Sequence, residues 1–218
     1  TTYVLAPPLK LVKNGRRASE PEDVKRIVSF RGDTFAQAWA LYRFSPTERT
    51  FKEERESAAR FHVFSIVADG DEALYAATWN EIWRYDGKWR RWFSGDSDLR
   101  VPHALAIGRD GRLYVGDDAR GLEIDATGEA QRQWEVESAV RALAIRQDRL
   151  YVGTLRSGLW TRPLRNDEPW TRIGPLHGLP KGQIRGMTFD TKGNLWLAIE
   201  ITHEAGGIAF LPATLFTD

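Results

Sequence analysis

The chain has 218 residues, which is enough for one large domain or two small ones. Its 31 Lys and Arg residues nearly balance 30 Asp and Glu residues, and the net charge of +1 indicates no general attraction to nucleic acid or to membranes. The lack of cysteine excludes disulfides, thiolate metal sites and a cysteine nucleophile, and no apolar run approaches the roughly 20 residues of a membrane-spanning helix. The chain begins at Thr1 without a signal peptide, so we expect a processed chain or part of a longer polypeptide.

A repeated pattern runs along most of the sequence. Five segments align with one another, namely residues 26–44, 62–92, 103–124, 140–160 and 184–210. Each contains an apolar or aromatic anchor residue, and the anchors are Phe35, Leu74, Leu113, Leu150 and Leu195. These anchors are 39, 39, 37 and 45 residues apart, which is the period of a β-propeller blade.

Within each repeat, short runs of strand-forming residues alternate with turns. In the repeat that starts at residue 140, the runs are ALAI, LYVGT, LWTR and, after a longer connection, PWTRI. In the repeats before and after it, the turns RDG and TKG separate the first two runs, and glycine supplies the positive φ that a tight hairpin needs. Four strands in about 40 residues indicate a four-stranded propeller blade.

The last repeat has only three evident strands and ends near Leu211. Thr2–Ala6 belongs to no repeat, and we predict that it pairs with the last blade as its outer strand and so closes the ring. The prediction is an all-β fold: a single domain, residues 1–218, forming one five-bladed β-propeller of four-stranded antiparallel blades. A part of a six- or seven-bladed propeller is the alternative. The predicted blades cover approximately residues 24–54, 61–93, 102–135, 138–173, and 183–211 together with 2–6.

Residues 100–211 resemble the two-component-regulator propeller repeat. The segments that carry the resemblance are VRALAIRQDRLYVGTLRSGLW and IGPLHGLPKGQIRGMTFDTKGNLWLAIE. The sequence departs from that pattern at His177, where the family usually has an acidic residue, and at Ala198 and Ile199, which replace a Gly-Thr pair. The resemblance implies an extracytoplasmic, periplasmic or secreted, sensor region of a bacterial signalling protein. The segment PHALAIGRDGRLYVGDD also resembles propellers of the streptogramin-lyase and gluconolactonase type.

The first strand of each propeller blade lines the central axis, so residues at its start are candidates for a ring. We expect this ring to attract an anion, because guanidinium groups match carboxylate and phosphate. Pairing of the arginines with acids in the loops is the structural alternative. The predicted ring consists of Arg26, His62, His103, Arg141 and Arg185.

The loops between the second and third strands of the blades open at the same end. Their aromatic, acidic and basic residues are typical of a binding surface for a polar ligand, a sugar or a peptide. The candidates in these loops are Trp79, Asp117, Asp118, Arg156 and His203.

Catalytic motifs are weak in this sequence. The four histidines lack the close spacing of a metal site, and two of them fall in the predicted arginine ring, which disfavours a cation. There is no Gly-x-Ser-x-Gly elbow, and neighbours such as Asp117 and Asp118 point to opposite faces of a strand. We therefore expect no catalytic residue, no metal and no cofactor.

The sequence thus predicts a non-enzymatic sensor or interaction module. Its expected partner is a small anionic or polar ligand, or another protein, bound at the axial face of the propeller; we expect no nucleic acid and no membrane partner. The alternative is a small-molecule lyase or hydrolase that uses the central channel.

Overall fold

The computed structural model describes residues 24–54, 62–95, 99–118, 120–165, 168–202 and 205–216. The chain divides into two compact units, unit 1 with residues 1–102 and unit 2 with residues 103–218. Every regular element in the described ranges is a β-strand or a short 3₁₀ turn, namely η2 (Pro175–His177) and η3 (Ala213–Leu215). No helix in these ranges has the length and apolar character needed to cross a bilayer.

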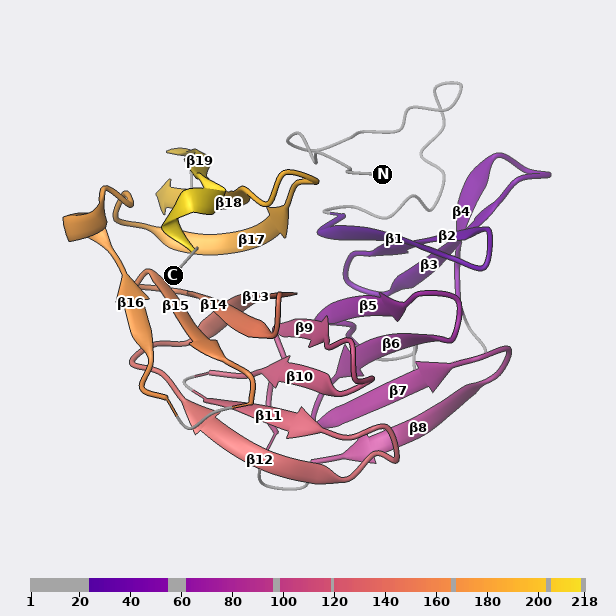
Figure 1. Cartoon of the computed structure of the whole chain (residues 1–218). Helices are drawn as coiled ribbons and strands as arrows, with labels where there is room; N and C mark the ends of the chain where they lie inside the picture. Colours follow the sequence, from indigo (N-terminus) through magenta and orange to yellow (C-terminus); the bar gives the residue numbers. More distant parts are fainter. Residues whose placement is uncertain are drawn as a thin grey trace. The chain divides into compact units, whose positions relative to one another are not determined.

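Unit 1 contains two sheets of four strands, each in consecutive antiparallel order (Figure 1). The first sheet consists of β1 (Arg26–Phe30), β2 (Asp33–Gln37), β3 (Leu41–Ser45) and β4 (Thr50–Glu53). The second consists of β5 (Ser65–Asp69), β6 (Ala73–Thr78), β7 (Glu81–Tyr85) and β8 (Trp89–Ser94).

Unit 2 contains three sheets with the same meander order. The first consists of β9 (Ala104–Ile107), β10 (Leu113–Gly116), β11 (Arg120–Ile124) and β12 (Ala130–Glu135). The next consists of β13 (Val140–Arg146), β14 (Arg149–Thr154), β15 (Leu159–Pro163) and β16 (Thr171–Ile173). The last consists of β17 (Gln183–Phe189), β18 (Leu195–Thr202) and β19 (Ala205–Leu211).

These five sheets confirm the predicted fold class, an all-β protein built from five propeller blades. The last sheet has three strands in the described part of the chain. Thr2–Ala6, the segment predicted to complete it, lies outside the described residues, so that pairing stays a prediction.

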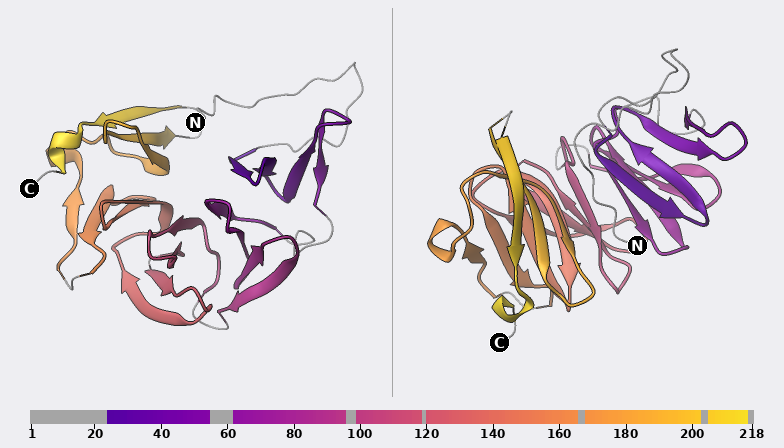
Figure 2. Two further views of the ribbon diagram at one scale, coloured as in Figure 1. Left: turned by 45° about the vertical axis from the view of Figure 1, so that its right-hand side comes forward. Right: turned by 90° about the horizontal axis from the view of Figure 1, so that it is seen from above.

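Each blade is stabilised by packing its face against the next blade of the same unit. The five anchor residues of the repeat are all fully buried in second strands. In unit 1, Phe35 and Leu74 belong to one apolar cluster that combines both sheets. In unit 2, one cluster joins the first two sheets and another joins the last two, and Figure 2 shows these sheets side by side. Burial of apolar area between sheets is therefore the main stabilising contribution.

Two glycines set how closely neighbouring blades approach in unit 2. A Cβ atom at Gly153 would lie 2.5 Å from Cγ2 of Ile184, which belongs to the next blade. Gly116 occupies the equivalent position one blade earlier, where a Cβ would collide with Val140. Ala198 takes this position in the last blade, and its side chain is exposed. Residue 198 departs from the repeat pattern, and among the described residues no neighbouring strand packs closely against it.

The Asp-x-x-Gly-x-Leu-Trp motif of the last repeat is explained by one turn. A carboxylate oxygen of Asp190 accepts hydrogen bonds from the backbone N–H groups of Lys192 and Asn194, both at 2.9 Å. Its other oxygen accepts from Nδ2 of Asn194 and from Nε1 of Trp196. These four donors lower the Asp190 pKa to about 2. The motif is therefore a turn that joins β17 to β18.

We expect Gly153→Ala to lower the free energy of unfolding by about 1–3 kcal/mol, because the added methyl group must push Ile184 out of its packing position. Urea unfolding measures this change. The control is Gly207→Ala, since a Cβ at Gly207 meets no atom within 4 Å. Equal stability of both variants would contradict the close approach of the blades.

Candidate functional site

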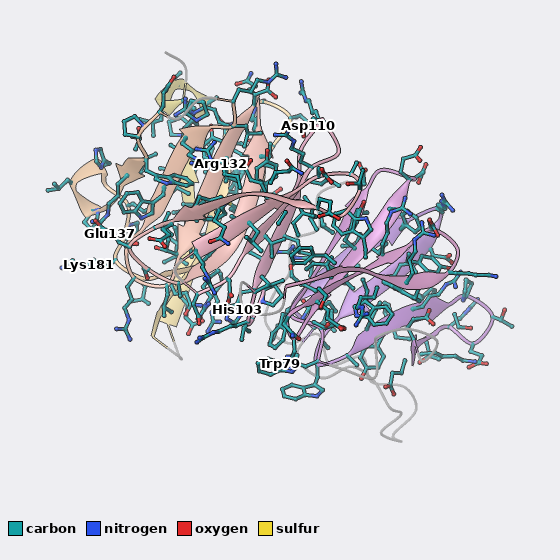
Figure 3. The ribbon with its side chains drawn as sticks, turned by 90° about the horizontal axis from the view of Figure 1, so that it is seen from below. Trp79, His103, Asp110, Arg132, Glu137 and Lys181 are labelled. Carbon is teal, nitrogen blue, oxygen red and sulfur yellow. The ribbon has the colours of Figure 1, made fainter. Side chains whose placement is uncertain are left out.

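The two ends of each sheet carry different residues. We call the end at which the first strand begins, and at which the second strand turns into the third, the loop end. The opposite end, where the first and second strands join, is the hairpin end. Figure 3 shows His103 and Asp110 at opposite ends of the sheet β9–β12. The predicted site residues that the structure describes belong to the loop end.

Strand register shows which predicted ring residues are equivalent in unit 2. The pairs that fix the register are Ala104–Gly116, Ala142–Gly153 and Gly186–Ala198. His103, Arg141 and Arg185 each come directly before the first-strand member of such a pair. The three residues therefore occupy the same position in three successive blades, at the loop end.

The ring assignment needs correction in unit 1. Ser65 pairs with Ala77, the equivalent of Gly116, so Phe64 takes the position of His103. His62 lies two residues earlier in the chain. Phe64 lies ten residues before its anchor, as His103 and Arg185 do, whereas His62 lies twelve before, so the spacing from the anchor agrees with the strand register.

Arg26 also lies away from the ring position. Arg26 pairs with Gln37, which lies two residues after the anchor Phe35. In unit 2, the residue that follows a ring residue pairs with a residue that lies three after the anchor, as Ala104 does with Gly116. Its guanidinium donates to Oγ of Ser65 at 3.3 Å and to the carbonyl oxygen of Ile66 at 3.1 Å. Burial lowers the Arg26 pKa. Arg26 thus connects the two blades of unit 1.

The loop end of unit 1 carries an aromatic cluster consisting of Trp39, His62, Phe64 and Trp79. The rings of Trp39 and His62 are 3.7 Å apart, and those of His62 and Phe64 stack at 4.2 Å. Trp79 meets the Phe64 ring edge-on at 4.8 Å. Trp39 is 70% exposed and Trp79 is 52% exposed, which leaves two indole faces in solvent.

Buried hydrogen bonds fix this cluster to the sheets. Nε2 of Gln37, a fully buried side chain, donates to the carbonyl oxygens of Ala38 and Val63. The Val63 N–H donates to the Trp39 carbonyl oxygen at 3.1 Å. The segment that carries His62 is thereby tied to the loop of the preceding blade. The exposed rings are preorganised, which reduces the entropy lost when a ligand binds.

Burial lowers the pKa of His62, and the positive charge of Lys25 lowers it further. The imidazole is therefore neutral at pH 7. Its Nε2 atom is buried and has no hydrogen-bond partner among the described residues. A neutral ring stacked between Trp39 and Phe64 extends the apolar surface of the aromatic cluster.

The loop end of unit 2 has a mixed charge. Arg141 is partly buried, and desolvation lowers its pKa; Asp118 and Asp117 oppose this effect, whereas Arg185 reinforces it. Nε of Arg185 forms an ion pair with Oε2 of Glu200 at 2.5 Å. The structural alternative, pairing with an acidic residue, thus holds for Arg185, although Glu200 lies in β18 and not in a loop.

The remaining predicted residues lie in loops. Asp117 is only 2% exposed, and its Oδ1 accepts a hydrogen bond from the Asp118 N–H at 2.8 Å, so this carboxylate binds the local backbone. Arg156 is exposed in the loop between β14 and β15, where its N–H donates to Oγ of Ser138. His203 lies outside the described residues. Among the residues that are described, no three His, Asp or Glu side chains gather as a metal site.

Trp39 and Phe64 were not predicted from the sequence. A usable signal exists for Trp39, because it lies between second and third strands, as Trp79 does in the next blade. A signal also exists for Phe64, which lies ten residues before the anchor Leu74, the spacing of His103 and Arg185 from their anchors, and the register of β5 with β6 agrees.

Comparisons with known proteins support the architecture. No protein-family model matches the chain, and no curated protein matches it. Among solved structures, it is similar to the extracellular domain assigned to the hybrid two-component system BT4673 of B. thetaiotaomicron, with a TM-score of 0.70 and 20% identity over 90% of this chain. The corresponding domain of BT3049 from the same organism has a TM-score of 0.65 and 15% identity over 88% of this chain.

This chain spans 28% of the BT4673 domain and 27% of the BT3049 domain. A computationally designed protein, Ika8, is also similar, with a TM-score of 0.60 and 12% identity over 82% of this chain and 56% of Ika8. At these identities the likeness shows the fold. The neighbours are domains of the kind that the repeat resemblance implied, extracellular parts of two-component systems.

We expect His62 to titrate below pH 6.5, and Trp39→Ala to move its midpoint upward, because the variant removes the ring that covers the imidazole. A lowered pKa means that the unfolded chain binds the proton more readily, so this residue makes the fold less stable as pH falls through 6.5. Proton NMR of the four histidines, with His62→Asn for assignment, measures the midpoint. An identical midpoint in both proteins would refute the stacking.

Proposed function

We propose that this chain is a non-enzymatic ligand-recognition module that binds a polar ligand, a sugar or a peptide, through the loop ends of its blades. The single observation that carries this proposal is the aromatic cluster of unit 1. Large exposed indole rings are uncommon on monomeric proteins, and two of them held by a stacked imidazole and phenyl ring form a flat apolar platform. Sugar rings and peptide side chains have faces that match such a platform.

The loop end of unit 2, taken by itself, supports recognition of a separate anionic ligand. Arg141 is desolvated, and a desolvated guanidinium binds a carboxylate or phosphate more strongly than one in bulk water. Arg185 is already paired with Glu200, so we assign it a supporting role beside Arg141.

The wider role follows from the neighbours. BT4673 and BT3049 are described as extracellular domains of signalling systems, and this chain spans just over a quarter of each. We propose that it is the extracytoplasmic sensor part of a larger polypeptide. The enzymatic alternative, a lyase or hydrolase acting in the central channel, predicts conversion of the bound ligand.

The direct experiment is a binding screen of the whole chain against arrays of neutral sugars, acidic sugars and peptides, followed by calorimetry on each hit. We expect Trp39→Ala and Trp79→Ala each to weaken binding about tenfold, because each removes one stacking surface. Trp196→Ala is the matched control, since it removes an exposed indole from β18 rather than from the aromatic cluster.

Arg141→Ala is expected to weaken those acidic ligands that bind at the loop end of unit 2. Mass spectrometry of the recovered ligand decides between binding and catalysis, and the proposal requires an unchanged ligand. Hits whose affinity is insensitive to both tryptophan substitutions would exclude the aromatic cluster as the binding surface.

A further inference from the structure

The two exposed indoles of the aromatic cluster are supported unequally. Among the described residues, the Trp39 side chain makes a ring contact with His62 alone, at 3.7 Å. Trp79 meets two rings, that of Phe64 at 4.8 Å and that of His62 at 6.4 Å. Trp39 is also the more exposed of the two indoles. The position of the Trp39 side chain therefore depends on where the His62 imidazole lies, whereas Trp79 has a second support.

The stacked position of His62 selects the neutral imidazole. The residue as a whole is only partly buried, but its Nε2 atom is buried and lacks a hydrogen-bond partner in the part of the chain that the structure describes. A protonated imidazole carries an N–H group on both ring nitrogens, so charging the stacked ring would place a buried donor at Nε2 without an acceptor. Such a donor is unfavourable in the interior.

The charges around His62 act in the same direction. Burial lowers its pKa most, and Lys25, directly before β1, lowers it further. Arg26, the next residue, donates its guanidinium hydrogen bonds to oxygen atoms of β5. Glu81, which follows the loop of Trp79, accepts hydrogen bonds from side chains of β7 and β8. Lys25 is thus the one described charge that affects the His62 pKa, and it opposes protonation.

An imidazole that leaves the stack has an ordinary environment. A solvent-exposed histidine titrates near pH 6.5, so the displaced ring binds a proton more readily than the stacked ring. Acid therefore favours the displaced ring. Between pH 6.5 and the lower pKa of the stacked ring, each pH unit reduces the ratio of stacked to displaced rings about tenfold.

We propose that His62 is a pH-operated support for Trp39: the neutral imidazole holds the indole in the aromatic cluster, and protonation displaces the imidazole and releases the indole. Trp79 keeps its contact with Phe64 in both states. The aromatic cluster is therefore complete only at a pH at which His62 is neutral. An effect of pH on ligand binding rests on the proposed function, whereas the release of Trp39 needs no ligand.

The experiment records the indole N–H signals of the full chain by NMR between pH 7.5 and pH 5, without a ligand. Trp39→Phe and Trp79→Phe assign the two signals. We expect the Trp39 signal to move toward that of a solvent-exposed indole, and to become more accessible to a soluble paramagnetic probe. The midpoint of this change should coincide with that of the His62 ring protons. The Trp79 signal should change much less, because its contact with Phe64 remains.

His62→Phe is the decisive variant, because it keeps a stacking ring that takes up no proton. It should abolish the pH response of the Trp39 signal. Lys25→Ala should raise the midpoint, since it removes the positive charge near the imidazole. His177→Asn is the matched control: it removes a histidine of unit 2, whose Nδ1 accepts from the Gly174 N–H, and should leave the response unchanged. If His62→Phe does not fold, His62→Gln replaces it and should show the released Trp39 signal already at pH 7.5.

Three results would overturn the proposal: a Trp39 signal that stays constant while His62 titrates, equal changes at Trp39 and Trp79, or a pH response that persists in His62→Phe. A His62 midpoint at or above pH 6.5 would also overturn it, because a cation–π contact with Trp39 would then hold the charged ring in the stack. Release of Trp39 in a chain for which the binding screen finds no ligand would refute the proposed function and support this inference.

Discussion

The structure depends on the burial of sheet faces against neighbouring sheets. A four-stranded meander has two faces, and apolar residues on both must be covered if the sheet is to be stable in water. In this chain the anchors of the repeat are fully buried, and Gly153 and Gly116 permit the second strand of one blade to approach the first strand of the next. The sequence repeats because each blade must bury its apolar residues against a neighbouring blade in the same way.

The same requirement decides where function is located. Because blade faces are occupied by packing, chemistry is left to the ends of the sheets and to the edges of the contacts between them. At the loop end of unit 1, Trp39 and Trp79 remain exposed, while the buried Gln37 side chain donates a hydrogen bond to the carbonyl oxygen of Val63. Polar side chains inside these contacts serve the fold, as Arg26 does.

The fold was largely predictable, because hydrophobic anchors at a constant period and Asp-Gly or Lys-Gly turns are local signals. The same period also predicted that Arg141 and Arg185 occupy equivalent positions in successive blades. His62 was misplaced, although Phe64 has the same spacing from its anchor as His103 and Arg185 have from theirs. The buried Glu123–Arg162 ion pair was not foreseen, since it arises from side chains 39 residues apart on different blades. The departure at Ala198 was noticed in the sequence, but its exposed side chain was visible only in the structure.

Native-state hydrogen exchange in unit 2 tests most directly whether the blades stabilise one another. If packing between blades is the dominant contribution, the amides of β10 and β14 exchange only through a common opening with the same free energy, and denaturant lowers that free energy equally for both strands. If the blades were independently stable, β10 and β14 would exchange with different free energies and different denaturant dependences, which would contradict this account.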